Sequence, residues 1–441
     1  MPLPRRLPRL LLPLLLLGAG LLPGPVLAQR TTIEAYAEQV RAAEQARRLR
    51  DRIGLARALE AMRAMRPQDP RPRRALAALA AGDGEVERTA TLLESLARQG
   101  LTEDLALDPA FERVREQPRL RELFDRLRDN GRPQGEGEPV LELPRRDFFP
   151  EGLAWDGRRQ RWLLGSVAQR EIVAVGPDAA PVVFAREGLW SVQGLAIEPG
   201  RDRLWVVSSA YPEMRDHDPL LAGRAALLAY ALEDGRLVAR IEAPADGELH
   251  AFNDLWVDAQ GGVFISDSGA GRLWRLDPGA RQLRALTPPR SLDGPQGLAP
   301  SADGSALLVA DYGRGLQRVA LESGQIEPVQ VPDTLTTIGI DGLVAHRGDL
   351  LAIQNGVQPR RVLRLRLDAS GRQVTAHEVL AQALREFDEP TLGVVVDERL
   401  VLVANSPWRY ARGSAGLDPQ APLRPPLLLA LRLMPPRGGR P

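Results

Sequence analysis

Pro295-Gln296-Gly297-Leu298-Ala299 is one copy of a short unit from which the fold of this chain can be predicted. The unit consists of a polar residue before a turn and an apolar strand. Six copies occur in the second part of the sequence. The other five are Pro150-Glu151-Gly152-Leu153-Ala154, Val192-Gln193-Gly194-Leu195-Ala196, Phe252-Asn253-Asp254-Leu255-Trp256, Ile340-Asp341-Gly342-Leu343-Val344 and Pro390-Thr391-Leu392-Gly393-Val394. A unit that recurs every ~40 to 50 residues is typical of the blades of a β-propeller.

A second polar residue follows each copy by 14 or 15 positions, at the end of another apolar run. We call these residues the second polar set: Ser166, Ser208, Asp267, Asp311, Asn355 and Asn405. If the first strand of each unit leaves one face of the propeller and the second returns antiparallel to it, both polar sets lie on that face. They then surround one mouth of the central channel. Further apolar runs complete about four strands per unit, so the sequence predicts a mainly β protein with a six-bladed β-propeller.

The last unit has no outermost strand of its own after the run from Leu427 to Leu433. Open sheet edges tend to pair with other chains, and folded proteins protect them. We therefore expect Val140 to Leu143 to pair with this edge and to join the two ends of the ring.

The N-terminus differs in composition from the rest of the chain. Three early arginines, an apolar run from Leu10 to Leu22 and the small-residue site Val26-Leu27-Ala28 predict a signal peptide and export to the periplasm or the medium. An apolar run of about a dozen residues is shorter than a membrane span, so we expect no span in the mature chain. The predicted regions are a signal peptide (1–28), a small α-helical domain (29–130), a linker (131–138), the propeller (139–434) and a C-terminal tail (435–441).

The helical domain is predicted from apolar residues at helical spacing, such as Leu55, Leu59 and Met62. Glycines and prolines divide it into short segments, as in helical hairpins. Residues 75–83 and the leucines after them resemble a tetratricopeptide helix pair. Two roles stay open, a module that docks a protein partner and a capping domain that packs against the propeller.

The residue types present exclude several kinds of chemistry. All 58 basic residues are arginines, and the chain has no Cys. Schiff bases, thiol nucleophiles, disulfides and thiolate metal sites are thereby excluded. The formal net charge is only +1, so no basic surface predicts nucleic acid as a partner. Neither a glycine-rich phosphate loop nor Gly-x-Ser-x-Gly occurs, so nucleotide binding and serine esterase chemistry have no motif.

The polar residues of the six repeated units, which we call the first polar set, offer oxygen donors and no histidine. They are Glu151, Gln193, Asn253, Gln296, Asp341 and Thr391. Carboxylate and amide oxygens suit hard cations such as Ca²⁺, Mg²⁺ or Mn²⁺. We expect Glu151 and Asp341 to be functional, because a carboxylate in a narrow mouth is costly to desolvate without a cation. Gln193 and Thr391 are expected only to satisfy backbone groups where their strands begin.

The chain resembles the regucalcin and gluconolactonase family of six-bladed propellers in its metal-site motifs. They are Phe149-Pro150-Glu151-Gly152, Phe252-Asn253-Asp254, Pro295-Gln296-Gly297-Leu298 and Asp341-Gly342, within roughly residues 148–406. The resemblance implies metal-assisted hydrolysis of a sugar lactone with one divalent metal ion, Ca²⁺ first and Mg²⁺, Mn²⁺ or Zn²⁺ as alternatives. By motif, Glu151, Gln296 and Asp341 are then the metal ligands, and Asp341 is also the catalytic base. Asn253 lies beside the substrate.

The chain departs from the family pattern at two positions. Gln296 stands where the family has a shorter asparagine, and Ala251 stands where its lactonases often carry an arginine that grips the substrate. His250, three residues before Asn253, is taken as a second substrate-binding residue, with a satisfied loop histidine as the alternative.

Two further features have open interpretations. The insertion from Ser209 to Gly223 is either a lid over the site or a solvated loop. Asp267 and Asp311 either form a second cation site or cap strand ends.

The sequence thus predicts an exported, divalent-metal-dependent hydrolase of a lactone or related ester. Its ligand is expected to be a small lactone or a sugar-derived molecule, and the helical domain is a candidate site for a protein partner. The alternative is a non-catalytic propeller that binds a ligand or a partner and holds a structural Ca²⁺.

Overall fold

The computed structural model describes residues 25–177 and 179–433 of the 441-residue chain. Most of the predicted signal peptide and all of the predicted tail lie outside the described residues. In the part of the chain that the structure describes, no helix is long and apolar enough to cross a membrane.

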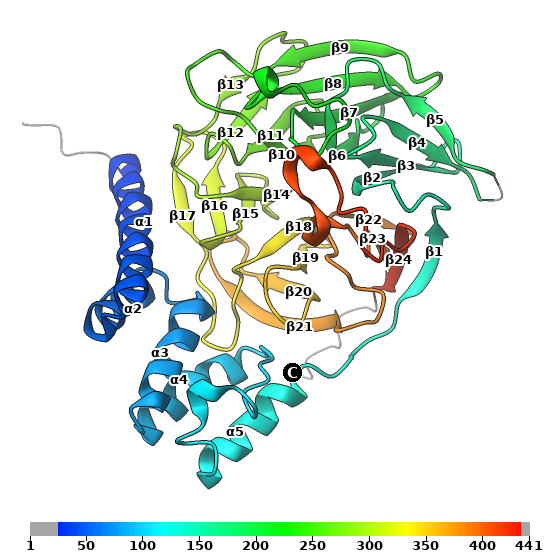
Figure 1. Cartoon of the computed structure of the whole chain (residues 1–441). Coiled ribbons are helices and arrows are strands. Elements are labelled where there is room, and N and C mark those ends of the chain that lie inside the picture. The colour runs from blue at the N-terminus through cyan, green and yellow to red at the C-terminus, as the bar shows by residue number, and fades with distance from the viewer. Residues whose placement is uncertain (1–24, 178, 434–441) are drawn as a thin grey trace, which may run out of the picture.

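Within the described residues, five α-helices precede the first strand and form the helical region (Figure 1). They are α1 (Pro25–Leu49), α2 (Arg52–Met65), α3 (Pro70–Gly82), α4 (Val86–Arg98) and α5 (Pro118–Asp129). Asp51 and Asp69 begin α2 and α3, where each side chain accepts a hydrogen bond from a free backbone N–H of the first turn. Buried side chains such as Leu93, Phe111 and Leu127 form the core between the helices.

The remaining described chain forms six four-stranded antiparallel sheets around a central channel, which confirms the predicted six-bladed propeller (Figure 1). Blade 1 is β2 (Pro150–Asp156), β3 (Arg161–Ser166), β4 (Ile172–Val175) and β5 (Val182–Ala185); blade 2 is β6 (Ser191–Ile197), β7 (Arg203–Ser209), β8 (Ala225–Ala231) and β9 (Leu237–Glu242); blade 3 is β10 (Phe252–Val257), β11 (Val263–Asp267), β12 (Arg272–Leu276) and β13 (Arg284–Ala285). Blade 4 is β14 (Pro295–Pro300), β15 (Ala306–Asp311), β16 (Gly315–Ala320) and β17 (Ile326–Pro328); blade 5 is β18 (Ile340–His346), β19 (Asp349–Gln354), β20 (Arg361–Leu367) and β21 (Val374–Gln382).

The sixth blade joins the two ends of the ring. It contains β22 (Gly393–Val396), β23 (Arg399–Val403) and β24 (Leu427–Arg432), with β1 (Glu138–Glu142) as its outermost strand. β1 pairs antiparallel with β24, so that Glu138 lies opposite Ala430. The strand expected from Val140 to Leu143 is therefore confirmed, and the edge of β24 is covered by the segment that precedes blade 1.

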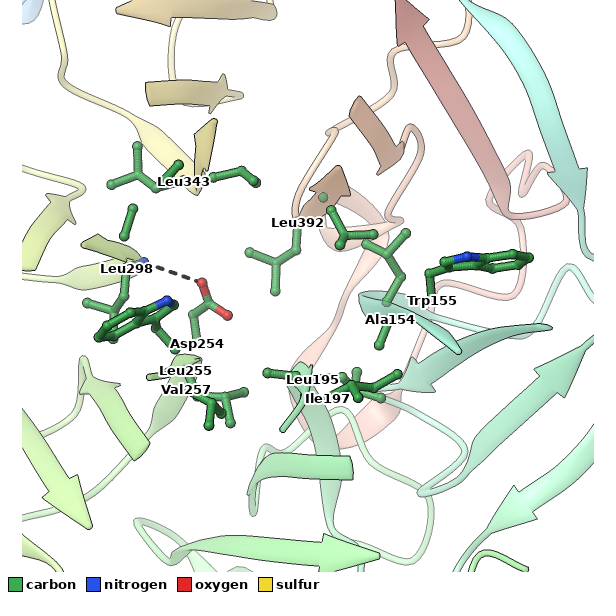
Figure 2. A pocket seen from close by; sticks show the side chains of 18 of the residues that line it. Ala154, Trp155, Leu195, Ile197, Asp254, Leu255, Val257, Leu298, Leu343 and Leu392 are labelled. Carbon is green, nitrogen blue, oxygen red and sulfur yellow. Dashed lines mark hydrogen bonds between the residues drawn. The ribbon is translucent and has the colours of Figure 1, made fainter. Parts of the chain in front are cut away.

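A glycine after the polar residue lets neighbouring first strands approach each other around the channel. A Cβ atom at Gly297 would lie 2.5 Å from the backbone nitrogen of Leu343, and one at Gly342 would lie 2.6 Å from the backbone oxygen of Thr391. In the third copy Asp254 occupies the glycine position, and its carboxylate points into the channel (Figure 2).

The strand register brings the two polar sets to one end of the channel, which we call the mouth. Phe252, the residue before Asn253, pairs with Asp267, and Pro295, the residue before Gln296, pairs with Asp311. The residues of the first polar set therefore lie where the innermost strands begin. Those of the second polar set lie where the neighbouring strands end, at the same end of the channel, as antiparallel pairing predicted.

The helical region packs against loops on the mouth side of blades 4 and 5. Arg66 Nη1 lies 2.8 Å from Asp293 Oδ2 and donates to the backbone oxygen of Gly313 at 2.9 Å. The backbone nitrogen of Thr102 donates to Gln358 O at 2.9 Å. At least this face of the helical region thus serves as a cap on the propeller.

Candidate functional site

Glu151 and Asp341 lie in the mouth with only 7% and 9% of their surfaces exposed. Glu151 Oε2 accepts hydrogen bonds from Trp408 Nε1 at 2.7 Å and from Ser406 Oγ at 3.2 Å. Asp341 Oδ2 accepts from Asn355 Nδ2 at 2.7 Å. Among the described residues neither carboxylate forms an ion pair, and Glu151 Oε1 and Asp341 Oδ1 accept no hydrogen bond. Two carboxylate oxygens therefore remain free to bind a cation or a ligand.

The mouth favours the protonated form of both carboxyl groups. Burial raises the pKa of Asp341 to about 7, although the hydrogen bond from Asn355 acts in the opposite direction. Burial, and then the charge of Asp341, raise the pKa of Glu151 well above its usual range. Glu389, just before Pro390, is near enough for its charge to raise the pKa of both groups further. A bound cation would offset this repulsion.

The two amides of the first polar set contact each other. Asn253 Nδ2 donates to Gln296 Oε1 at 2.5 Å. Asn253 Oδ1 accepts from Ser268 Oγ at 2.9 Å and from Tyr211 Oη at 3.2 Å. The structure thus places the predicted ligand Gln296 directly beside the predicted substrate residue Asn253.

Gln193 and Thr391 differ in their surroundings. Thr391 Oγ1 donates to the backbone oxygen of Glu151 at 3.0 Å, which is the local role expected of it. Gln193 is 2% exposed, and among the described residues its buried Nε2 has no hydrogen-bond acceptor. A buried amide without a partner costs free energy, so this group is a candidate donor to a ligand rather than a backbone cap.

Most of the second polar set binds loops of its own blade. Asp267 Oδ1 accepts from the backbone nitrogens of Ala251 and Ala270 at 2.9 and 3.1 Å. Asp311 accepts from the backbone nitrogens of Asp293 and Gly294 at 2.9 and 3.1 Å. Both carboxylates therefore have the capping geometry, which was one of the two interpretations.

His250 belongs to the same loop system. Its Nδ1 lies 2.7 Å from Asp267 Oδ2, and its Nε2 lies 3.0 Å from the backbone oxygen of Pro244. Burial acts to lower the pKa of His250, but the hydrogen bond to Asp267 and the charges of Asp267 and Asp246 raise it overall. With both ring nitrogens occupied, the histidine has the geometry of the satisfied loop residue.

Two segments outside the repeats cover the mouth. Tyr211 comes from the insertion of blade 2, and Trp408 lies in the short 3₁₀ helix Trp408–Tyr410 between β23 and β24. Their ring centroids are 6.0 Å apart, and Trp408 also contacts Phe149 with ring centroids 4.7 Å apart. The segment between β23 and β24, orange-red in Figure 1, crosses the centre of the ring. The insertion from Ser209 to Gly223 thus reaches the mouth, as expected for a lid.

Several side chains of the mouth were not predicted from the sequence, namely Trp408, Tyr312, Ser268, Ser406 and Glu389. A signal for three of them was present: Ser268, Tyr312 and Ser406 each directly follow a member of the second polar set. No comparable signal marks Trp408, because it reaches Glu151 from 257 positions away in the sequence.

A channel lined mostly by apolar side chains continues below the mouth between the six innermost strands (Figure 2). Its cavity has a volume of about 440 Å³ and is lined by residues such as Leu195, Leu298, Leu343 and Leu392. Asp254 is the acidic residue in this lining, and its Oδ2 accepts from the backbone nitrogen of Leu298 at 3.4 Å. Burial raises the pKa of Asp254 to about 7.

The donor set of the mouth fits a hard cation only if amide oxygens and water take part. Within the described residues no group of three or more His, Cys, Asp and Glu side chains could hold a metal ion. The free oxygens of Glu151 and Asp341 would supply two carboxylate ligands, and Gln296 Oε1, which now accepts from Asn253, would supply an amide oxygen. Such a set suits Ca²⁺ or Mg²⁺ better than a soft metal.

No protein-family model matches the chain, and no curated protein is similar to it in sequence. Similar solved structures include a gluconolactonase from Xanthomonas campestris (16% identity, 68% of this chain and 90% of that chain, TM-score 0.46). Another is the calcium-binding protein regucalcin from Agrobacterium tumefaciens (18% identity, 67% of this chain and 93% of that chain, TM-score 0.46). Other neighbours are proteins of different kinds, such as a virginiamycin B lyase from Staphylococcus aureus (13% identity, 67% of this chain and 99% of that chain, TM-score 0.43), so the likeness concerns the fold alone.

Proposed function

We propose that the protein is a divalent-metal-dependent hydrolase that opens a small lactone or a related ester in the mouth of the propeller. The observation that carries the proposal is the pair Glu151 and Asp341, which are buried without a cationic partner among the described residues and keep one oxygen each free. Two buried carboxylates are stable together only when protonated or when a cation neutralises them. A small ligand suits the mouth because Tyr211 and Trp408 cover it.

The residues of the mouth have separate roles in this proposal. A divalent cation held by Glu151, Asp341 and Gln296 would polarise the lactone carbonyl and lower the pKa of a bound water. Asn253 would orient the substrate from its place beside Gln296. Asp341 would bind the cation through Oδ1 and accept a proton from the attacking water on Oδ2, which keeps one lone pair beside the hydrogen bond from Asn355. The water oxygen would bond to the carbonyl carbon, the ring C–O bond would break, and the leaving oxygen would take that proton from Asp341 to give a hydroxy acid.

The test is hydrolysis of a panel of sugar lactones and acyl-homoserine lactones by the purified mature protein. Assays run with EDTA and with added Ca²⁺, Mg²⁺, Mn²⁺ or Zn²⁺. We expect turnover of at least one lactone that EDTA abolishes and one metal restores. Absence of metal-dependent turnover with every lactone would reject the hydrolase.

Metal binding is tested separately by metal analysis and calorimetric titration of Glu151→Gln and Asp341→Asn. We expect both variants to lose metal, because each removes one of the two carboxylate ligands. Glu389→Gln is the matched control, since it removes a charge from the same mouth but not a proposed ligand. Full metal retention by both ligand variants would show that the site lies elsewhere.

A second candidate is a non-catalytic propeller that binds a small ligand and a structural Ca²⁺. One observation favours it: Gln296 Oε1 accepts a hydrogen bond from Asn253, so the proposed amide ligand is engaged by the proposed substrate residue. Binding of a lactone in calorimetry without turnover would select this function.

We also propose that the chain is exported, on the basis of the signal peptide predicted over residues 1–28. The mass of the protein recovered from the periplasm or the medium tests this directly. A mature N-terminus at Gln29 is the expected result, and recovery of the full-length chain only from the cytoplasm would contradict it.

A further inference from the structure

Gln354, the last residue of β19, is fully buried on the mouth side of blade 5. Its Nε2 donates to the backbone oxygens of Thr336 at 2.9 Å and Ile338 at 2.7 Å, and its Oε1 accepts from Arg361 Nε at 2.6 Å. Both amide hydrogens and the amide oxygen are thus in use. Loss of any one bond would leave a buried polar group unsatisfied, so this amide fixes the loop before β18 against the first residue of β20.

The helical region holds the loop before β18 through the corner between α2 and α3. Gln68 Oε1 accepts hydrogen bonds from Thr337 N at 3.2 Å and from Thr337 Oγ1 at 2.8 Å. The backbone oxygen of Gln68 accepts from Thr336 Oγ1 at 3.0 Å. Thr336 and Thr337 are almost completely buried, so Gln68 and Gln354 together fix this loop.

The helical region also holds Arg361, the other partner of Gln354. Arg361 is 2% exposed and forms no ion pair within the described residues, and burial lowers its pKa to about 10. Its Nη1 donates to the backbone oxygen of Gln99, the C-cap of α4, at 2.9 Å. The C-terminal end of a helix carries partial negative charge, which stabilises the guanidinium. Gly100 has a φ of +70°, and a Cβ there would lie 3.2 Å from Arg361 Nη1.

Asn355, the residue after Gln354, belongs to the second polar set and contacts the proposed functional carboxylate of Asp341. Asn355 Nδ2 donates to Asp341 Oδ2 at 2.7 Å and to the backbone oxygen of Pro390 at 3.0 Å. Its Oδ1 accepts from Tyr312 Oη at 2.9 Å. Tyr312 directly precedes Gly313, whose backbone oxygen is held by Arg66 of the helical region. The helical region therefore contacts Gly313, next to Tyr312, and Arg361, which binds Gln354, so it reaches neighbours of Asn355 from two directions.

We infer that the helical region is part of the functional site, because Gln68 and the C-terminal end of α4 hold Thr336 and Arg361, the partners of Gln354, and thereby position Asn355 and Asp341. Gln68 and Gln354 are then positioning residues, and Arg361 links Gln354 to α4. The face of the helical region that carries these contacts is occupied by the propeller and is not free for a separate partner.

Hydrogen exchange of the full mature chain, measured by mass spectrometry, tests this inference without reference to any activity. Gln68→Ala removes the oxygen that accepts the hydrogen bonds of Thr337. Gln68→Glu keeps an acceptor oxygen on a side chain of the same length. Gln382→Ala is the matched control: Gln382 Nε2 donates to the backbone oxygens of Asn130 and Arg132 at 3.0 and 3.1 Å, so it joins the helical region to the outer strand of the same blade.

We expect Gln68→Ala to raise the exchange rates of amides in residues 336–341 and 354–361 about tenfold, because local opening becomes easier. Gln68→Glu should restore protection, and Gln382→Ala should leave these segments unchanged. Unchanged exchange in Gln68→Ala, or an equal rise in Gln382→Ala, would overturn the inference.

A kinetic readout rests on the proposed function. With an active lactone, Gln68→Ala should lower kcat about tenfold with little change in KM, since misplacement of Asp341 affects the reacting geometry. Gln68→Glu should recover the lost kcat, and an unaltered kcat in Gln68→Ala would count against positioning. If no lactone is hydrolysed by the wild type, the proposed function fails, while the exchange data still decide whether Gln68 positions the mouth.

Discussion

Asp254→Asn should make the protein more stable at neutral pH and have little effect at acidic pH. The carboxyl group lies in the apolar channel, and burial raises its pKa from 3.8 to about 7. Between about pH 4 and pH 7 the folded state therefore binds more protons than the unfolded state, so the free energy of unfolding falls as the pH rises. An asparagine does not titrate and can still accept the hydrogen bond from the backbone of Leu298.

The size of the effect follows from the difference of about 3 in pKa. Each pKa unit corresponds to about 1.4 kcal/mol, which gives an upper value of about 4 kcal/mol. The side chain borders the channel cavity, where water can solvate part of the carboxylate. We therefore expect Asp254→Asn to raise the free energy of unfolding by about 2 to 4 kcal/mol above pH 7, and by almost nothing near pH 4.

Urea denaturation followed by circular dichroism, at pH values from 4.5 to 8 with EDTA present, measures this difference. Asp303→Asn is a control of opposite sign, because hydrogen bonds from Ser301 and Ser305 lower the pKa of Asp303 to about 2. That control should destabilise the protein at neutral pH. A stability difference for Asp254→Asn that does not change with pH, or a less stable variant at pH 8, would refute the reasoning.

Hydrogen bonds in and around the mouth give three further predictions. Trp408→Phe keeps the aromatic contacts but removes the hydrogen-bond donor to Glu151. We expect the Kd for Ca²⁺, measured by calorimetry, to rise about tenfold. An unchanged Kd would argue against Glu151 as a ligand. Gln193→Leu removes the unpaired amide, so KM for an active lactone should rise about tenfold without loss of stability. An unaffected KM would remove Gln193 from the ligand site. His250→Leu should lower the free energy of unfolding by about 1 to 3 kcal/mol, because Asp267 loses a hydrogen-bond partner, and should leave KM unchanged. A raised KM at unchanged stability would indicate that His250 binds the substrate.

The repeat explains why the architecture was predictable. Each copy carries its own polar residue, turn and apolar strand, so the information for one blade lies within one stretch of sequence. Closure was predictable for the same reason: the last unit lacks a strand, and Val140 to Leu143 supplies one in β1.

The roles within the two polar sets were less predictable, because similar residues at equivalent positions have different partners. Asp267 and Asp311 bind backbone nitrogens of their own blades, whereas Asn355 binds Asp341. Gln193 and Thr391 were expected to behave alike, yet Thr391 bonds to a backbone oxygen and the Nε2 of Gln193 has no acceptor among the described residues.

Six blades, the closure of the ring and one mouth that contains Glu151, Asn253, Gln296 and Asp341 were predictable, because they depend on a local pattern and on antiparallel return. The cover formed by Trp408 and Tyr211, and the contacts by which the helical region holds the partners of Gln354, were found in the folded protein alone. Those contacts join segments that are far apart in the chain. They depend on how whole elements pack, which leaves no periodic signal in the sequence.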